Sequence, residues 1–123
     1  MSPDTIFEAA SLSKPVFAYG VLLLAREGRL DLDAPLTRYT ETPPVPGDPR
    51  LEGITARLVL SHSTGFPNWR PGRWTDAPGP LTIDFDPGTR FGYSGEGYEY
   101  LRLAVERFFD PNPDGPEGMG FAT

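Results

Sequence analysis

The longest hydrophobic stretch of the chain covers residues 16–25 and is apolar on nearly every side of a helix. Such a helix is buried on several sides rather than lying along a surface. Pro15 precedes the stretch, and proline is tolerated only in the first turn of a helix because it has no N–H. The pattern therefore predicts a helix that begins near residues 11–12 and ends before Gly28, which suits the left-handed C′ position.

Two short helical segments are predicted after this helix. Asp33 and Pro35 have the residue types of a cap and a first-turn proline, for a single turn that ends near Tyr39. Thr55 is suited to cap a second short helix over residues 56–61, whose central apolar side chains are expected to face inward.

The last predicted helix spans residues 95–109, with Ser94 as its cap. Its apolar residues recur at helical spacing, namely Tyr98, Leu101, Val105 and Phe108. Proline-rich residues 40–50 and 66–90 predict loops, and the tail over 111–123 is expected to be poorly ordered.

Composition narrows the possible functions. The chain has 14 glycines and 15 prolines among 123 residues, which favours long loops between few helices. Its net charge of −6 argues against a nucleic-acid partner, because phosphate binding needs a cationic face. The absence of cysteine excludes disulfides and thiolate metal sites, and the single histidine argues against a histidine metal site. The apolar run is too short to span a bilayer, and we expect no signal peptide from the N-terminal pattern.

The first candidate for chemistry is the pair Ser11 and Lys14, three residues apart at the start of the long helix. We expect Ser11 at the N-cap and Lys14 one turn inward on the same face. The pair is either an ordinary cap with a solvated lysine or a nucleophile with its base. The apolar helix favours the second interpretation, because a lysine drawn out of water can act as a base. The helix start would also supply an amide for a developing oxyanion.

The second candidate is Tyr93, which lies just ahead of the last predicted helix. It is either an aromatic residue of the core or a phenol held beside Lys14. In the second case the positive charge of the lysine would favour the phenolate and make Tyr93 a general base.

Four motifs resemble, in their order, those of the beta-lactamase family of serine hydrolases. They are Ser11-x-x-Lys14, residues 60–67 (LSHSTGFP), residues 86–91 (DPGTRF) and Tyr93-Ser94-Gly95, and residues 27–36 are similar to the stretch after that family's active-site helix. The nearest branch is the group of class C beta-lactamases, penicillin-binding-protein-like proteins and esterases. The resemblance implies a mainly α chain with long loops. It would correspond to the helical part of the α/β beta-lactamase and transpeptidase-like fold without most of its antiparallel sheet, with a partial domain over residues 1–110.

The resemblance also implies a mechanism. Ser11 would be the acylated nucleophile, Lys14 would assist its deprotonation, and Tyr93 would transfer protons to and from the leaving group and water. An acyl-enzyme would form and be hydrolysed, on a small ester, beta-lactam or D-alanyl peptide, without a metal or organic cofactor. Members of the family are often periplasmic or secreted and some are cytoplasmic, so no compartment follows.

Two departures from the family pattern refine this expectation. Gly95 stands where the family usually has asparagine, which favours simple ester hydrolysis over beta-lactam or peptide turnover. The third family motif, Lys or His followed by Thr/Ser and Gly, is not found, so we expect a fragment with weak or no hydrolysis in isolation. The alternative is a catalytically inactive fragment or relative that acts as a binding module.

Three further residue types have alternative interpretations. His62 belongs either to a catalytic triad with Ser11 or to a structural turn, and the turn is favoured because lysine and tyrosine already fill the role of a base. Trp69 and Trp74 either line an acyl pocket or cover a core, and Arg90 is expected to anchor the adjacent turn rather than bind substrate.

Overall fold

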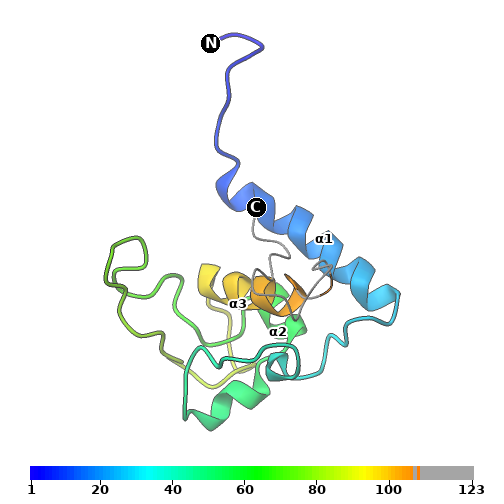
Figure 1. Cartoon of the computed structure of the whole chain (residues 1–123), viewed down its shortest axis with the longest axis vertical. Coiled ribbons are helices and arrows are strands. Elements are labelled where there is room, and N and C mark those ends of the chain that lie inside the picture. The colour runs from blue at the N-terminus through cyan, green and yellow to red at the C-terminus, as the bar shows by residue number, and fades with distance from the viewer. Residues whose placement is uncertain (107, 109–123) are drawn as a thin grey trace. The chain divides into compact units, whose positions relative to one another are not determined.

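The computed structural model describes residues 1–106 and 108 of the chain (Figure 1). Three α-helices and three short 3-10 segments make up its regular structure: η1 (Ala10–Leu12), α1 (Ser13–Arg26), η2 (Leu36–Arg38), η3 (Pro49–Gly53), α2 (Ala56–Leu60) and α3 (Gly95–Glu106). The described residues contain no β-strand, only an isolated antiparallel bridge between Pro35 and Thr55. The expectation of a mainly helical chain with long loops is confirmed.

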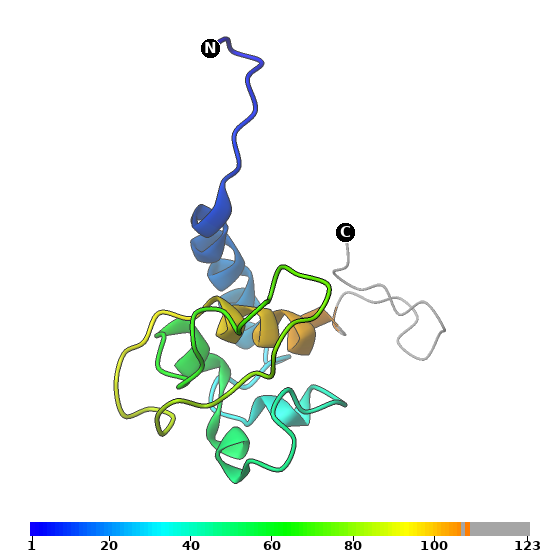
Figure 2. The same ribbon diagram turned by 90° about the vertical axis from the view of Figure 1, so that its left-hand side faces the viewer.

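The chain divides into two compact units. The N-terminal unit (Met1–Leu30) contains η1 and α1, and the main unit (Asp31–Thr123) contains the other elements. Within the main unit a long connection leaves α2, makes a wide loop and returns to the start of α3 (Figure 2). Each unit has its own candidate residues.

Helix α1 begins two residues later than Ser11. Pro15 is its third residue and lies within its first turn, as the sequence predicts. The prediction that Ser11 is the N-cap is wrong: Ser11 lies inside η1, and Leu12 precedes α1 without a side-chain cap bond. The reason is that the backbone is already helical at Leu12 and Ser13, so the first amides donate to carbonyls of η1.

The end of α1 follows the sequence closely. Gly28 has φ of +75°, the left-handed conformation that glycine adopts without steric cost. Its N–H donates to the carbonyl of Ala25 at 3.0 Å, and the N–H of Arg29 donates to that of Leu24 at 3.0 Å. These two bonds form a Schellman motif, which satisfies carbonyls that a helix end otherwise leaves unpaired.

The apolar surface of α1 is only partly buried. Val21 and Leu24 are buried, whereas four other apolar side chains are exposed, namely Val16, Tyr19, Leu22 and Leu23. The burial on several sides that the apolar pattern predicts is therefore not observed, whereas an exposed apolar patch is what we expect of this helix without the sheet on which it would pack. A physical reason is that the described part of the chain contains no sheet for the helix to pack on.

The core of the main unit is built around α2 and α3. Thr55 caps α2 as predicted, since its Oγ1 accepts a hydrogen bond from the Leu58 N–H at 3.3 Å. Asp33 does not cap the next turn, because its carboxylate is bound by the Arg57 guanidinium, with Nε 2.6 Å from Oδ1. The largest fully buried apolar side chains come from several elements: Phe66, Leu36, Ile54, Leu101, Val59 and Val105.

Helix α3 starts where the sequence predicts. The Oγ of Ser94 accepts a hydrogen bond from the Gly97 N–H at 2.9 Å, which confirms Ser94 as the cap. The buried stripe of α3 includes Tyr100, Leu101, Ala104 and Val105, while Tyr98 is half-buried. The helix is described to Glu106; its predicted end at residue 109 and the tail over 111–123 lie outside the described residues.

Candidate active site

Ser11 and Lys14 meet within the N-terminal unit. Lys14 Nζ donates a hydrogen bond to Ser11 Oγ over 3.2 Å. The two residues are three positions apart along the continuous helical stretch formed by η1 and α1, which places them on one face. Ser11 is exposed and Lys14 is half-buried. The separation lies at the long end of the range that proton transfer between a nucleophile and its base requires.

The backbone just before Ser11 is unusual. Ala10 has φ of +47°, a left-handed conformation that residues with a Cβ rarely adopt. Such outliers are often found at functional sites, where the surrounding structure enforces them. The sequence does not predict this conformation, because alanine has no preference for positive φ.

Tyr93 lies in the main unit, with 41% of its surface exposed. Its ring stacks on the imidazole of His62, with ring centroids 4.3 Å apart and an interplanar angle of 23°. His62 Nδ1 accepts a hydrogen bond from the backbone N–H of Ser94 at 3.1 Å, so a neutral imidazole at this position carries its proton on Nε2. His62 therefore contacts both residues of the Tyr93–Ser94 segment, through a ring stack and a hydrogen bond. These contacts agree with its expected place in a structural turn.

A second tyrosine lies close to the same imidazole. The ring of Tyr98 is 5.3 Å from that of His62, centroid to centroid. Burial raises the pKa of the Tyr98 phenol, and the nearby Tyr93 raises it further through charge repulsion between the two phenolates. Tyr98 therefore remains protonated, and it acts as a neutral neighbour of Tyr93.

A buried ion pair fixes the loop after α2 to the start of α3. The side chain of Glu96 is fully buried and accepts hydrogen bonds from Arg70 Nε at 3.0 Å, Arg70 Nη2 at 2.9 Å and the Arg70 backbone N–H at 3.1 Å. Burial raises the pKa of Glu96, but these bonds and the charge of Arg73 lower it, and the net pKa lies below its ordinary value. Sequence reasoning missed this pair. The only local signal is a carboxylate between Gly95 and Gly97 in a first helical turn.

The same loop lies directly on Gly95. The N–H of Gly95 donates to Asn68 Oδ1 at 2.9 Å, and the N–H of Glu96 donates to the Asn68 carbonyl at 2.9 Å. A Cβ built on Gly95 would overlap three carbon atoms of the Trp69 ring. The Trp69 ring therefore takes the space that a side chain at position 95, where the family usually has asparagine, would need.

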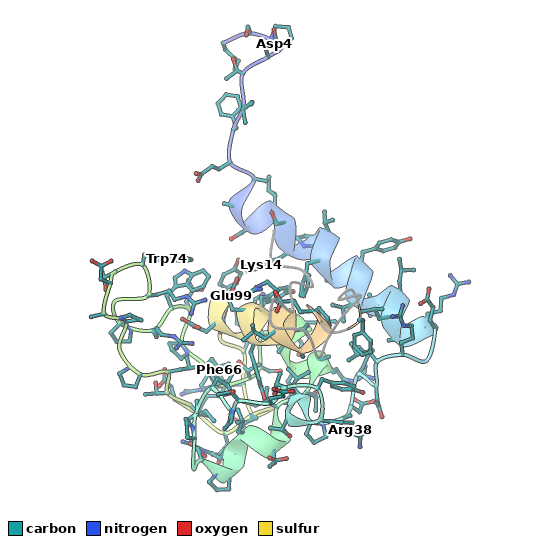
Figure 3. The ribbon with its side chains drawn as sticks, viewed as in Figure 1. Asp4, Lys14, Arg38, Phe66, Trp74 and Glu99 are labelled. Atoms are coloured by element: carbon teal, nitrogen blue, oxygen red, sulfur yellow. The ribbon has the colours of Figure 1, made fainter. Side chains whose placement is uncertain are left out.

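Trp74 and Arg90 each contact an aromatic ring of the main unit. Trp74 packs edge-on against Trp69, with ring centroids 5.2 Å apart, and Figure 3 shows it on the loop that follows α2. The Arg90 guanidinium lies over the Phe85 ring at 4.6 Å from its centroid. Among the described residues no group of three or more acidic, histidine or cysteine side chains could hold a metal ion. No helix in that part of the chain is long and apolar enough to cross a membrane.

The sequence matches the family model described as "Beta-lactamase" over residues 1–113. The chain belongs to the beta-lactamase family. The resemblance inferred from the four ordered motifs is thereby confirmed.

Three individual proteins are similar to this chain over more than half of its length. A protein of Dichelobacter nodosus named "Putative fimbrial assembly protein FimD, serogroup D" is 32% identical over 123 positions, which cover 89% of this chain and 31% of that protein. Penicillin-binding protein 4* of Bacillus subtilis is 29% identical over 123 positions, covering 87% and 26% respectively. Esterase EstB of Burkholderia gladioli is 40% identical over 70 positions, covering 56% and 18%. The chain thus spans less than a third of the length of these relatives.

Proposed function

We propose that this chain carries part of the active site of a serine hydrolase that acts through an acyl-enzyme. Ser11 is the nucleophile, Lys14 activates it, and Tyr93 is the general base. The observation that carries the proposal is the 3.2 Å hydrogen bond between Lys14 Nζ and Ser11 Oγ at the start of α1. The relationship to a penicillin-binding protein and an esterase supports an ester or amide substrate.

Acylation begins when Ser11 Oγ attacks the carbonyl carbon of an ester. The proton of the hydroxyl passes to Lys14 Nζ, and the electron pair of the carbonyl moves to its oxygen. The carbonyl then re-forms, the bond to the alcohol oxygen breaks, and that oxygen receives the proton by way of Tyr93.

Deacylation repeats these steps with water. A water molecule attacks the acyl carbon while its proton passes to Tyr93, which serves as the general base. The bond to Ser11 Oγ breaks, and the oxygen regains a proton through Lys14. The net reaction converts one ester and one water into an acid and an alcohol, and it uses no metal or organic cofactor.

The environment of Gly95 supports simple esters as the substrate class. Position 95 offers no side-chain amide to an acylamino group, and the Trp69 ring fills the space above it. We therefore place esters ahead of beta-lactams and D-alanyl peptides. The same observation favours a second candidate, a catalytically inactive relative that binds a peptidoglycan-like ligand or a partner chain.

Covalent labelling separates these candidates. The full-length protein that contains residues 1–123 is incubated with a fluorophosphonate and its intact mass is measured. The proposal predicts one adduct, which is lost in Ser11→Ala and forms more slowly in Lys14→Ala. Ser13→Ala is the matched control, because Ser13 is exposed and lies two residues away. Equal labelling of the wild type and Ser11→Ala would refute the assignment, and no labelling of either would favour the binding module.

A further inference from the structure

His62 contacts three consecutive residues of the segment that carries Tyr93. Its backbone carbonyl accepts a hydrogen bond from the Gly92 N–H at 2.7 Å, its ring stacks on the ring of Tyr93, and its Nδ1 accepts a hydrogen bond from the Ser94 N–H at 3.1 Å. All of these residues belong to the main unit. His62 therefore holds the main chain on both sides of Tyr93 as well as the ring of Tyr93 itself.

The backbone of His62 is fixed in an unusual conformation. His62 has φ of +54°, and its N–H donates to the carbonyl of Val59 in α2 at 3.1 Å. A residue with a Cβ keeps a positive φ only where the surrounding structure enforces it, and such residues are frequent at functional sites. Glycine would meet this backbone requirement without steric cost. The backbone alone therefore does not explain a histidine at this position, whereas the contacts of its ring do.

The hydrogen bond to Ser94 requires a neutral imidazole. Nδ1 accepts a hydrogen bond only while it carries no proton, and in the imidazolium form both ring nitrogens are donors. Nδ1–H would then face the Ser94 N–H, and the bond between them would be lost. Histidine has an ordinary pKa of about 6.5, so this change falls near neutral pH. The hold on the segment around Tyr93 therefore depends on pH.

Two titratable side chains face the His62 ring, and both are phenols. Tyr93 stacks on it, and Tyr98 of α3 lies 5.3 Å from it, centroid to centroid. Burial raises the pKa of the Tyr98 phenol, so Tyr98 stays protonated and offers no charge to an imidazolium. A phenolate at Tyr93 would attract an imidazolium, which would favour the base form of Tyr93 and speed its reaction. This effect has the opposite sign to the loss of the Ser94 bond, so a rate measured against pH separates the two.

Protonation of His62 would leave the start of α3 in place. The Oγ of Ser94 accepts a hydrogen bond from the Gly97 N–H at 2.9 Å and donates one to the Pro67 carbonyl at 2.8 Å. Neither bond involves a group that titrates near neutral pH. The Ser94 amide would therefore be released together with the Tyr93 ring, while the cap of α3 remains.

We propose that His62 is a positioning residue, which holds Tyr93 in place for deacylation only while its imidazole is neutral. Deacylation then slows as His62 takes up a proton. This inference rests on the proposed function, because it assumes that Tyr93 takes the proton of water in that step. It adds a control by pH that acts through Tyr93 rather than through Ser11 or Lys14.

The test compares two variants at position 62 in the full-length protein that contains residues 1–123. His62→Asn keeps an acceptor at the same place, since Oδ1 and Nδ1 are both bonded to Cγ, but it does not titrate. His62→Gly keeps the backbone contacts and loses the side-chain acceptor. Glycine and asparagine are the residues most readily found at positive φ, so neither change opposes the local backbone conformation.

Each protein is mixed with p-nitrophenyl butyrate at several pH values. The burst of p-nitrophenolate gives the rate of acylation, and the decay of the butyryl-enzyme, followed by intact mass, gives the rate of deacylation. Acylation is the internal control, because p-nitrophenolate leaves without a proton from Tyr93. Dividing the deacylation rate of the wild type by that of His62→Asn removes the titrations of Lys14 and Tyr93, which both proteins share.

This deacylation ratio should fall about tenfold between pH 7.5 and 5.5 for a histidine of ordinary pKa, while the acylation ratio stays constant. His62→Gly should deacylate about ten- to a hundredfold more slowly than the wild type at pH 7.5, as expected for a misplaced base. The pH dependence needs only the wild type and His62→Asn, so it decides the question even if His62→Gly does not fold.

Three results would overturn the role of His62 and leave the acyl-enzyme at Ser11 intact. They are a deacylation ratio that is constant with pH, a ratio that rises as pH falls, and equal losses of acylation and deacylation in His62→Gly. The last of these would show that His62 only supports the fold. Absence of a butyryl group on Ser11 in the wild type would overturn the proposed function as well.

Discussion

Removal of the Glu96 carboxylate should destabilise the main unit more than any other single change to its ion pairs. In Glu96→Ala the guanidinium and backbone N–H of Arg70 lose their shared acceptor, and Arg73 loses one of its two partners. The side chain of Glu96 is fully buried, whereas that of Arg70 is 23% exposed. Part of the lost pairing of Arg70 can therefore be replaced by water.

The expected loss follows from this geometry. Breaking a fully buried ion pair by removing one partner costs about 3–5 kcal/mol, and the partial exposure of Arg70 lowers the expectation to about 3 kcal/mol. In a domain of this size each kcal/mol shifts the midpoint of thermal unfolding by roughly 4–8 °C. Glu96→Gln keeps the shape and one acceptor oxygen but loses the charge, so we expect a loss of about 1–2 kcal/mol.

The assay is urea unfolding followed by tryptophan fluorescence, because Trp69 and Trp74 lie beside the ion pair. Glu99→Ala is the matched control: Glu99 is a partly exposed carboxylate on the same helix that also pairs with Arg73, so its removal should cost less than about 1 kcal/mol. A free energy of unfolding for Glu96→Ala within 0.5 kcal/mol of that of Glu99→Ala would refute the reasoning.

The same ion pair predicts a dependence on pH. Since the pKa of Glu96 in the folded state lies below its ordinary value of 4.5, ionisation of Glu96 stabilises the fold above that value. This contribution is lost as pH falls through the folded-state pKa. The difference in stability between wild type and Glu96→Gln should therefore shrink as pH is lowered from 6 to below 4.5. A difference that stays constant over this range would contradict the sign of the shift.

Three further predictions concern the start of α3 and the chain as a whole. Gly95→Ala should destabilise the main unit, because its Cβ would overlap the Trp69 ring, and Trp69→Ala should relieve part of that loss in a double-mutant cycle measured by thermal unfolding. Ser94→Ala removes the acceptor of the Gly97 N–H and should cost about 1 kcal/mol in urea unfolding; no loss would argue against the cap. The 123-residue chain alone should hydrolyse p-nitrophenyl esters weakly or not at all, and turnover equal to that of the full-length protein would contradict this.

The elements that the sequence predicted correctly are governed by local chemistry. Gly28 ends α1, and Thr55 and Ser94 cap α2 and α3, because each acts on amides or carbonyls within a few residues. The spacing of Ser11 and Lys14 likewise brings them together on any helical backbone. These signals need no knowledge of the rest of the chain.

The contacts that the sequence did not predict join residues that lie far apart along the chain. Glu96 and Arg70 are 26 residues apart, and nothing in either segment indicates that a buried carboxylate will meet a guanidinium. The contact between Trp69 and Gly95 spans the same distance, and it explains why only glycine fits there. The cap assigned to Ser11 was wrong because a 3-10 turn precedes α1, and no residue of Ala10–Leu12 marks that turn.

The central claim is that Ser11 becomes acylated. The full-length protein that contains residues 1–123 is mixed with p-nitrophenyl butyrate, quenched in acid within the first turnovers, digested and analysed by mass spectrometry. The account predicts a butyryl group on Ser11, present in Ser13→Ala and absent in Ser11→Ala. A butyryl group on any other residue, with none on Ser11 while p-nitrophenolate is released, would contradict it.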